Sequence, residues 1–290
     1  WEDATRILEQ FPKEHPQHPL QGKVTQKLAY AYDRSGRHHR AAAQYLQLGQ
    51  AQVDGGLQRE ALLRAAELFE RLGEDRDAVK TLELYLNRFP KPGDQAVGVM
   101  QQLADLESAN GDAARRRHWL GEIIKLDRSA GNAQTRRLAA QASLELAEQR
   151  LVDFRRIRLV KPLQKSLASK LREMKRALKA FNAAIDYGVA PVTSSATYNV
   201  ASMYDELSQE LRASERPGNL SAEELAQYEL LLEEQAAPFE QQAIEIYTSN
   251  VRQASAGPFD HWSEKSRQRL DVLRPGWVEG VNTKLNPVKR

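Results

Sequence analysis

The stretch LAYAYDRSGRHHRAAAQYLQL, residues 28–48, places small residues at regular intervals among bulky ones. Ala29 and Ala41 recur with Tyr32 and Tyr45 beside them, and Gly36 separates the two halves. Two helices approach closely only where small side chains meet, and aromatic rings fill the space beside such points. The stretch therefore predicts a pair of short, tightly packed helices that turn near Gly36.

The same spacing returns twice further along the chain. When Gly22, Arg59 and Val97 are each numbered as position 1, position 8 is an alanine and position 15 a glycine every time. The three starts lie 37 and 38 residues apart. A helix pair in such an array buries its apolar side only against its neighbours, so the core grows along one axis. The repetition predicts an all-α fold built from antiparallel helix pairs.

The first residues match only the second half of a repeat. Positions 20, 24, 27 and 32 of the pattern are occupied by Ala4, Leu8, Phe11 and Pro16. Because a solitary second helix leaves an apolar face uncovered, we expect the protein to continue upstream of Trp1 with further repeats. The alternative is a true end with a lone capping helix. A signal peptide or lipid anchor would be lost with that upstream piece.

Beyond residue 128 the spacing drifts while helical periodicity persists, and three parts are expected. Repeats occupy 1–127, the first of them truncated to its second helix. A long basic helix pair of similar type occupies 128–190, with one helix over 133–160 and a second that Pro162 opens. Degenerate helices and a C-terminal tail occupy 191–290.

The last part carries its own start and stop signals. Thr193 or Ser194 is expected to cap its first helix. An insertion over 214–238 follows, in which Ser221 and Glu224 form a capping box. We expect Pro238 to start a separate helix, and a final capping helix to span 259–273.

The amino-acid composition excludes some classes of function but does not identify one. The chain has 290 residues, 28% of them charged and 7% aromatic, with a formal net charge of +3. It has no cysteine, which removes disulfides and thiol chemistry and leaves the redox compartment open. No apolar run reaches the roughly 18 residues needed to cross a bilayer, so no transmembrane segment is expected. Such a small net charge gives no whole-molecule argument for nucleic acid.

The small net charge conceals two opposed segments. Between 155 and 179 ten basic residues face one acid, a balance of +9, and between 205 and 245 eleven acids face two arginines, a balance of −9. The basic segment either binds an anionic partner or packs beside the acidic one, and both interpretations stay open. Nucleic acid is disfavoured because no aromatics are interleaved for base stacking. The basic residues are Arg155, Arg156, Arg158, Lys161, Lys165, Lys170, Arg172, Lys175, Arg176 and Lys179.

Residues 1–127 resemble tetratricopeptide-repeat proteins, in particular the envelope-associated bacterial type that includes outer-membrane lipoproteins. The phrases ILEQFPKEHPQHPL and YLNRFPKP carry the envelope resemblance. Residues 190–273 resemble the C-terminal region of large repeat proteins that accompany Tol/Exb-like envelope motors in Gram-negative bacteria. The resemblance implies a right-handed superhelical solenoid, with longer irregular helices in the C-terminal half. It also implies protein partners bound in a concave groove, no cofactor, and a periplasmic or outer-membrane-associated location, with a cytoplasmic one as the alternative.

The family lines its groove with exposed positions of the first helix of each repeat. Lys27 and Arg34 lie two helical turns apart with Tyr30 between them, an arrangement suited to a partner carboxylate. The alternative is a solvated face whose charges pair internally, for example Glu67 with Arg71. Position 4 of the first complete repeat is Thr25, where the family usually has tryptophan. Carried over by position, the groove residues are Lys23, Gln26, Lys27, Tyr30, Arg34, Leu63, Arg64, Arg71, Gln101 and Gln102.

No pattern of catalytic or metal-ligating residues emerges. The six histidines lack metal-ligand spacing, and no phosphate loop, nucleophile elbow or HExxH motif occurs. The leading hypothesis is therefore a non-catalytic protein-interaction scaffold. The alternative function is a binding module for an anionic polymer or membrane surface that acts through 155–179. A third hypothesis is an enzyme in which the 214–238 insertion folds over glutamates of raised pKa.

Overall fold

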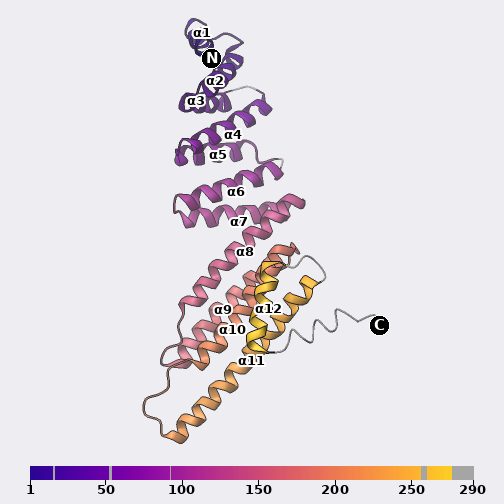
Figure 1. The fold of residues 1–290 in the computed structure, drawn as a ribbon. Coiled ribbons are helices and arrows are strands. Elements are labelled where there is room, and N and C mark those ends of the chain that lie inside the picture. Colours follow the sequence, from indigo (N-terminus) through magenta and orange to yellow (C-terminus); the bar gives the residue numbers. More distant parts are fainter. Residues whose placement is uncertain (16, 52–53, 92, 256–259, 276–290) are drawn as a thin grey trace, which may run out of the picture. The chain divides into compact units, whose positions relative to one another are not determined.

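The computed structural model describes residues 1–15, 17–51, 54–91, 93–255 and 260–275. These residues form twelve α-helices and no strand, so the predicted all-α class is confirmed (Figure 1). The chain divides into two compact units, Trp1–Thr135 and Arg136–Arg290. The helices are α1 (Glu2–Glu14), α2 (Gln21–Arg34), α3 (His38–Gln50), α4 (Gly55–Arg71), α5 (Asp75–Arg88), α6 (Gly93–Ala109), α7 (Ala113–Ala130), α8 (Ala133–Arg156), α9 (Leu163–Ile185), α10 (Ala190–Arg212), α11 (Ala222–Ser255) and α12 (His261–Leu273).

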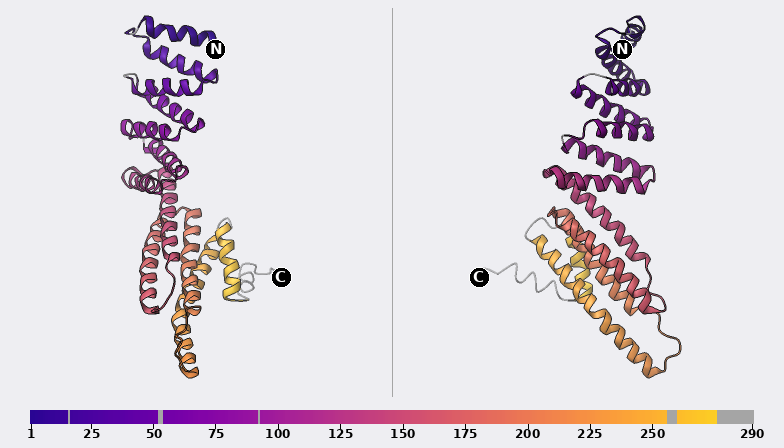
Figure 2. Two further views of the ribbon diagram at one scale, coloured as in Figure 1. Left: turned by 90° about the vertical axis from the view of Figure 1, so that its left-hand side faces the viewer. Right: turned by 180° about the vertical axis from the view of Figure 1, so that it is seen from behind.

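The first unit is a stack of helix pairs in which α2–α3, α4–α5 and α6–α7 repeat one arrangement (Figure 2). Gly36, Gly73 and Gly111 end the first helix of each pair with positive φ angles of 77°, 73° and 76°. Glycine adopts this left-handed conformation without a steric cost. In each turn, the amide following the glycine donates to a carbonyl five residues earlier, at 2.8–2.9 Å. The three glycine turns are therefore one motif used three times.

Small residues lie where the helices cross, as the spacing predicts. Ala29, Ala41, Ala65 and Ala78 are fully buried. Helix α3 packs against both α2 and α4, and α1 packs against α2. Leu28, Tyr32, Leu68 and Phe69 fill the space beside the alanines in one apolar cluster. Burial against neighbouring pairs thus supplies the core of this unit.

The second unit is packed around helix α10. Among the helices of this unit, α10 has the largest share of buried side chains. Phe154 of α8, Phe181 of α9, and Met203 and Leu207 of α10 share one cluster with Ala236 of α11. A second cluster docks α12 onto α10 and α11 through residues that include Tyr247 and Leu270.

Three helix boundaries in this unit differ from the sequence prediction, and the first is that α8 ends at Arg156 and not at residue 160. Pro238 does not start a new helix, because α11 runs through it. Pro238 and Glu234, four residues earlier, are both exposed, so water can satisfy the carbonyl that proline leaves unpaired. Helix α10 begins at Ala190, with Pro191 in its first turn, and not after Thr193 or Ser194.

Other expectations for the second unit have mixed outcomes. The capping box is confirmed, since Ser221 and Glu224 exchange hydrogen bonds of 2.7 and 3.3 Å. The final helix begins at His261 with Asp260 as its N-cap, whereas the prediction began at residue 259. Phe259 lies outside the described part of the chain, as does the tail from residue 276. Within the described residues, no helix is both long enough and apolar enough to cross a membrane.

Candidate functional site

The predicted groove residues lie on the first helices of the three pairs, α2, α4 and α6. We call their exposed surface the first-helix face. On α2, Lys23, Lys27 and Arg34 are exposed and have no ion-pair partner among the described residues. Tyr30 is 50% exposed, and its ring meets the edge of Trp1 at a centroid distance of 5.5 Å. The α2 part of this face therefore presents three uncompensated cations around an aromatic ring.

The junction between α2 and α4 is closed by charge pairing. Arg64 donates two hydrogen bonds to Asp33 Oδ2, at 2.5 and 3.2 Å, and a third to Glu67 at 2.6 Å. Arg71 also donates to Glu67, at 3.2 Å. Arg64 and Arg71 thus have the internal partners that the alternative interpretation proposed. Their charges contribute less to a partner than those on α2.

The environment of Asp33 favours its ionised form. Burial of the carboxyl opposes ionisation, but hydrogen bonds from Arg64 and from His38 outweigh it and lower the pKa of Asp33. The pKa of Arg64 is raised, chiefly by its hydrogen bond to Asp33. The pair therefore stays charged and ties the first helices of two consecutive repeats together.

Between α4 and α6 the first-helix face is hollowed. A cavity of about 470 Å³ is lined by Glu70, Gln101, Gln102 and Asp105, with Leu106 among its apolar walls. Gln102 donates to Glu70 across the two helices, and Gln101 donates to Asp105 at 3.1 Å. Burial raises the pKa of Glu70, against the hydrogen bond from Gln102. This end of the face is acidic and rich in carboxamides, in contrast to the basic end on α2.

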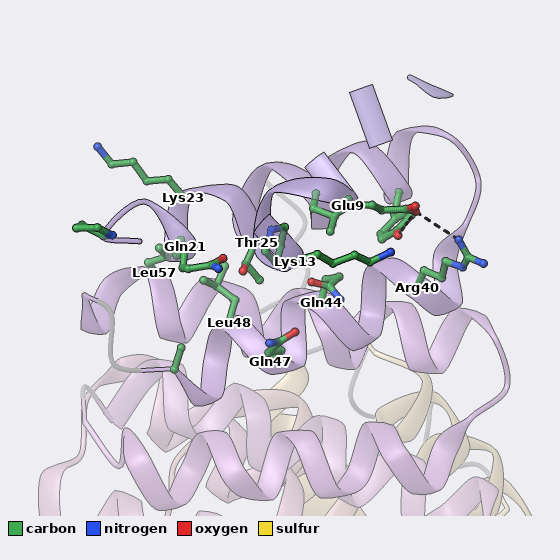
Figure 3. A pocket seen from close by; sticks show the side chains of 16 residues that line it. Glu9, Lys13, Gln21, Lys23, Thr25, Arg40, Gln44, Gln47, Leu48 and Leu57 are labelled. Carbon is green, nitrogen blue, oxygen red and sulfur yellow. Dashed lines mark hydrogen bonds and ion pairs between the residues drawn. The ribbon is translucent and has the colours of Figure 1, made fainter. Parts of the chain in front are cut away.

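A larger pocket is lined mainly by residues of α1, α2 and α3, with Leu57 of α4 at its edge, and sequence reasoning did not identify it. Its volume is about 1020 Å³. Leu28 supplies apolar lining. So do Leu48 and Leu57 (Figure 3). We call it the α1–α3 pocket. Of the predicted groove residues only Lys23 lines it, and Figure 3 shows that the Lys23 side chain extends away from it.

The pocket occupies a space that a side chain fills in the next repeat. Leu62 occupies position 4 of the second repeat, is fully buried, and packs directly on Gly49 of the preceding helix. The equivalent residue of the first repeat is Thr25, which lines the pocket. The departure from tryptophan at Thr25 was the available signal.

The basic segment of the second unit is divided between internal pairs and free cations. Arg155 pairs with Glu206, Lys161 with Glu215, and Lys170 with Glu210, all acids on α10 or just after it. Arg156 and Arg176 have acidic partners three residues away, Asp153 and Glu173. Of the remaining basic residues none has an ion pair among the described residues, and all are exposed: Arg158, Lys165, Arg172, Lys175 and Lys179.

The unpaired cations of α9 lie along its outer side. At about 100° per residue, Lys165, Arg172 and Lys179 fall within roughly 40° of one another and extend over ~21 Å of helix. Met174 and Phe181 occupy the opposite, buried side of α9. We call the exposed cations Lys165, Arg172, Lys175 and Lys179 the α9 stripe. Both interpretations of the basic segment are thus partly realised, each by different residues.

The glutamates of the predicted insertion serve structural contacts. Glu224 belongs to the capping box, and backbone and side-chain hydrogen bonds with Ser221 lower its pKa. Arg212 lowers the pKa of Glu233 by a hydrogen bond. A general acid needs a raised pKa, so these shifts run in the wrong direction for that role. In the described part of the chain, no group of three or more potential ligand side chains is arranged to hold a metal ion.

Stacked helix pairs with buried alanine crossings define the first unit as an all-α helical-repeat structure, a class that binds other molecules on exposed helix faces. Residues 60–92, which cover most of α4 and α5, match the family model of the tetratricopeptide repeat. Residues 60–92 therefore carry a tetratricopeptide repeat.

Two solved structures align over most of the chain at low similarity. The crystal structure of BtubC (BKLC) from P. vanneervenii has 16% identity and a TM-score of 0.37, covering 83% of this chain and 89% of that one. A tetratricopeptide repeat protein from Parabacteroides merdae has 13% identity and a TM-score of 0.36, covering 93% and 90%. No curated protein sequence matches the chain.

Proposed function

We propose that the protein is a non-catalytic scaffold that binds partner proteins or peptide segments on the first-helix face. The observation that carries the proposal is the opposed chemistry of its two ends. Lys27 and Arg34 on α2 are free to bind carboxylates, whereas Glu70 and Asp105 line the cavity between α4 and α6. An extended segment with acidic residues toward α2 and basic or amide residues toward α6 complements this face.

The bacterial envelope is the location we propose, periplasmic or associated with the outer membrane, with Tol/Exb-like motor components or outer-membrane proteins as candidate partners. The resemblance of residues 7–20, 85–92 and 190–273 to envelope repeat proteins supports this location.

A crosslinking pull-down from native extract tests the proposal, with captured proteins identified by mass spectrometry. The test variant is Lys27→Glu/Arg34→Glu. The matched control is Arg76→Glu/Arg117→Glu, which makes the same charge change on the second helices α5 and α7, at exposed arginines that have no ion pair among the described residues. We expect one specific partner to be captured by wild type and control and lost with the test variant. Equal capture by both variants would overturn the assignment of this face.

The α9 stripe supports a second candidate function, binding of an anionic membrane surface or polymer. Lysine and arginine near an anionic surface contribute ~1 kcal/mol each. We expect the chain to cosediment with phosphatidylglycerol-containing vesicles at low salt and to lose this with Arg172→Gln/Lys175→Gln/Lys179→Gln.

The matched control for this experiment is Arg137→Gln/Arg252→Gln/Arg274→Gln, exposed arginines of the same unit that lie outside the stripe. Binding to polyphosphate but not to vesicles would identify a polymer ligand. Equal loss with both triple variants would attribute the binding to net charge and not to the stripe.

A further inference from the structure

The α1–α3 pocket contains polar groups that have no partner among the described residues. Lys13 of α1, Thr25 of α2, and Gln44 and Gln47 of α3 line it, and none of these side chains has a hydrogen bond or ion pair to the described residues. The four groups come from three helices and share one pocket (Figure 3). A concave pocket in which polar side chains converge beside leucine and proline side chains is a candidate binding site.

The other polar groups of the pocket are already engaged. Glu9 accepts hydrogen bonds from the hydroxyl of Tyr32 and, at 3.5 Å, from Arg40. Gln21 donates to the carbonyl of His15 at 2.8 Å. The charge of Glu9 is offset by Arg40. Lys13 and Lys23 line the pocket without an ion pair among the described residues, but Lys23 extends away from it (Figure 3), so the ammonium group of Lys13 is the cation available to a ligand. An incoming ligand is therefore selected for negative charge at this point.

The two glutamines determine what else the ligand must offer. Gln44 and Gln47 lie three residues apart on α3, so their side chains project from neighbouring positions on one face of the helix. Each carboxamide has a donor and an acceptor, the same pair of functions that a peptide unit presents. Leu28 and Leu48 form an apolar floor, since both are buried. Amide recognition beside an apolar floor and a cation fits a polypeptide with aliphatic and acidic side chains.

We propose that the α1–α3 pocket binds an extended acidic segment of a partner protein, with its backbone on Gln44 and Gln47, an aliphatic side chain on the leucine floor and a carboxylate at Lys13. This site is separate from the first-helix face, so the proposal does not depend on partner binding at that face. It exists because position 4 is Thr25, whereas Leu62 fills the equivalent space one repeat later.

Fluorescence anisotropy with three labelled hexapeptide amides tests the proposal, using alternating leucine–glutamate, leucine–glutamine and leucine–lysine sequences. The leucine–glutamate peptide is expected to bind, the glutamine version more weakly by about fivefold, and the lysine version not at all. Thr25→Leu fills the pocket without changing charge and is expected to weaken binding by about tenfold or more. Thr25→Ser is the matched control and keeps wild-type affinity.

Further variants separate loss of the site from loss of the fold. Gln44→Ala/Gln47→Ala changes only partly or fully exposed side chains and is expected to weaken binding while the thermal midpoint stays within a few degrees. Lys13→Gln is expected to remove the preference for glutamate over glutamine. Lys27→Glu/Arg34→Glu leaves the peptide bound. The proposal is overturned if Thr25→Leu folds and binds as wild type does, or if only Lys27→Glu/Arg34→Glu abolishes binding.

Discussion

The ammonium group of Lys170 lies 2.7 Å from Glu210 Oε1, and the Lys170 side chain is fully buried. The same group donates to the carbonyls of Ile157 at 2.8 Å and Phe154 at 3.4 Å, and it lies 4.3 Å from the centre of the Phe154 ring. Lys170 therefore satisfies carbonyls at the C-terminal end of α8 from a position on α9, while its charge is balanced from α10. One side chain connects three helices of the second unit.

Replacing Lys170 with methionine should destabilise the second unit by about 2–4 kcal/mol. The methionine retains the apolar stem but leaves two carbonyls and Glu210 without the ammonium group. Chemical denaturation monitored by circular dichroism measures the change. Arg176→Gln is the control, because Arg176 pairs with Glu173 on the surface of the same helix and should cost less than about 1 kcal/mol. Equal stability of both variants would contradict the role of Lys170.

Asp33 should make the stability of the first unit depend on pH in the acidic range. Its pKa is lowered in the folded chain, so the stabilisation is complete above the unfolded-state value of ~3.9 and is lost as the pH falls through the folded value. Asp33→Asn should therefore lower the thermal midpoint at pH 7 and lose this disadvantage progressively below pH 4. Thermal unfolding of both proteins from pH 7 to pH 3 measures the difference. A constant difference across that range would show that ionisation of Asp33 is not the cause.

The repeated glycine turns can be tested with a pair of alanine substitutions. Gly73→Ala should destabilise the chain by about 1–2 kcal/mol, because the positive φ of 73° is unfavourable for a residue with a Cβ atom. Gly121→Ala, in the interior of α7, should stabilise it by about 0.5–1 kcal/mol, since no atom of another described helix lies within 4 Å of the added carbon. Urea denaturation compares the two. Changes of the same sign would contradict the turn assignment.

The docking of α12 should depend on Arg269. Its guanidinium donates two hydrogen bonds to Asp205 of α10, one of them at 3.0 Å, and the carboxylate is only 5% exposed. Arg269→Ala leaves a buried carboxylate unpaired and should cost about 3 kcal/mol. Amide hydrogen exchange should then be faster in α12. Arg267→Ala removes only surface pairs with Glu264 and Asp271, so protection of α12 should be nearly unchanged.

The sequence predicted which residues lie on the candidate surface but not which of their charges are paired. Positions in the repeat were sufficient to place Lys27, Arg34 and Gln101 on the first helices, because a helix face follows from spacing along the chain. That Arg64 is paired with Asp33 depends on a residue 31 positions away on another helix. The α1–α3 pocket was missed for a related reason. A threonine at position 4 leaves a pocket only if no side chain of the surrounding helices occupies the space beside it, and those helices are distant in the sequence.

By itself the sequence determined the helix pairs of the first unit. Alanines at the crossing points and a glycine after each first helix act locally, through steric fit and backbone conformation. Only the tertiary structure decided which charges are free. Lys170 and Lys175 are five residues apart on α9, yet one is fully buried and paired with Glu210 and the other is exposed and unpaired. The difference arises because the electrostatic environment of a charge depends on the helices packed around it, and those helices lie far away in the sequence.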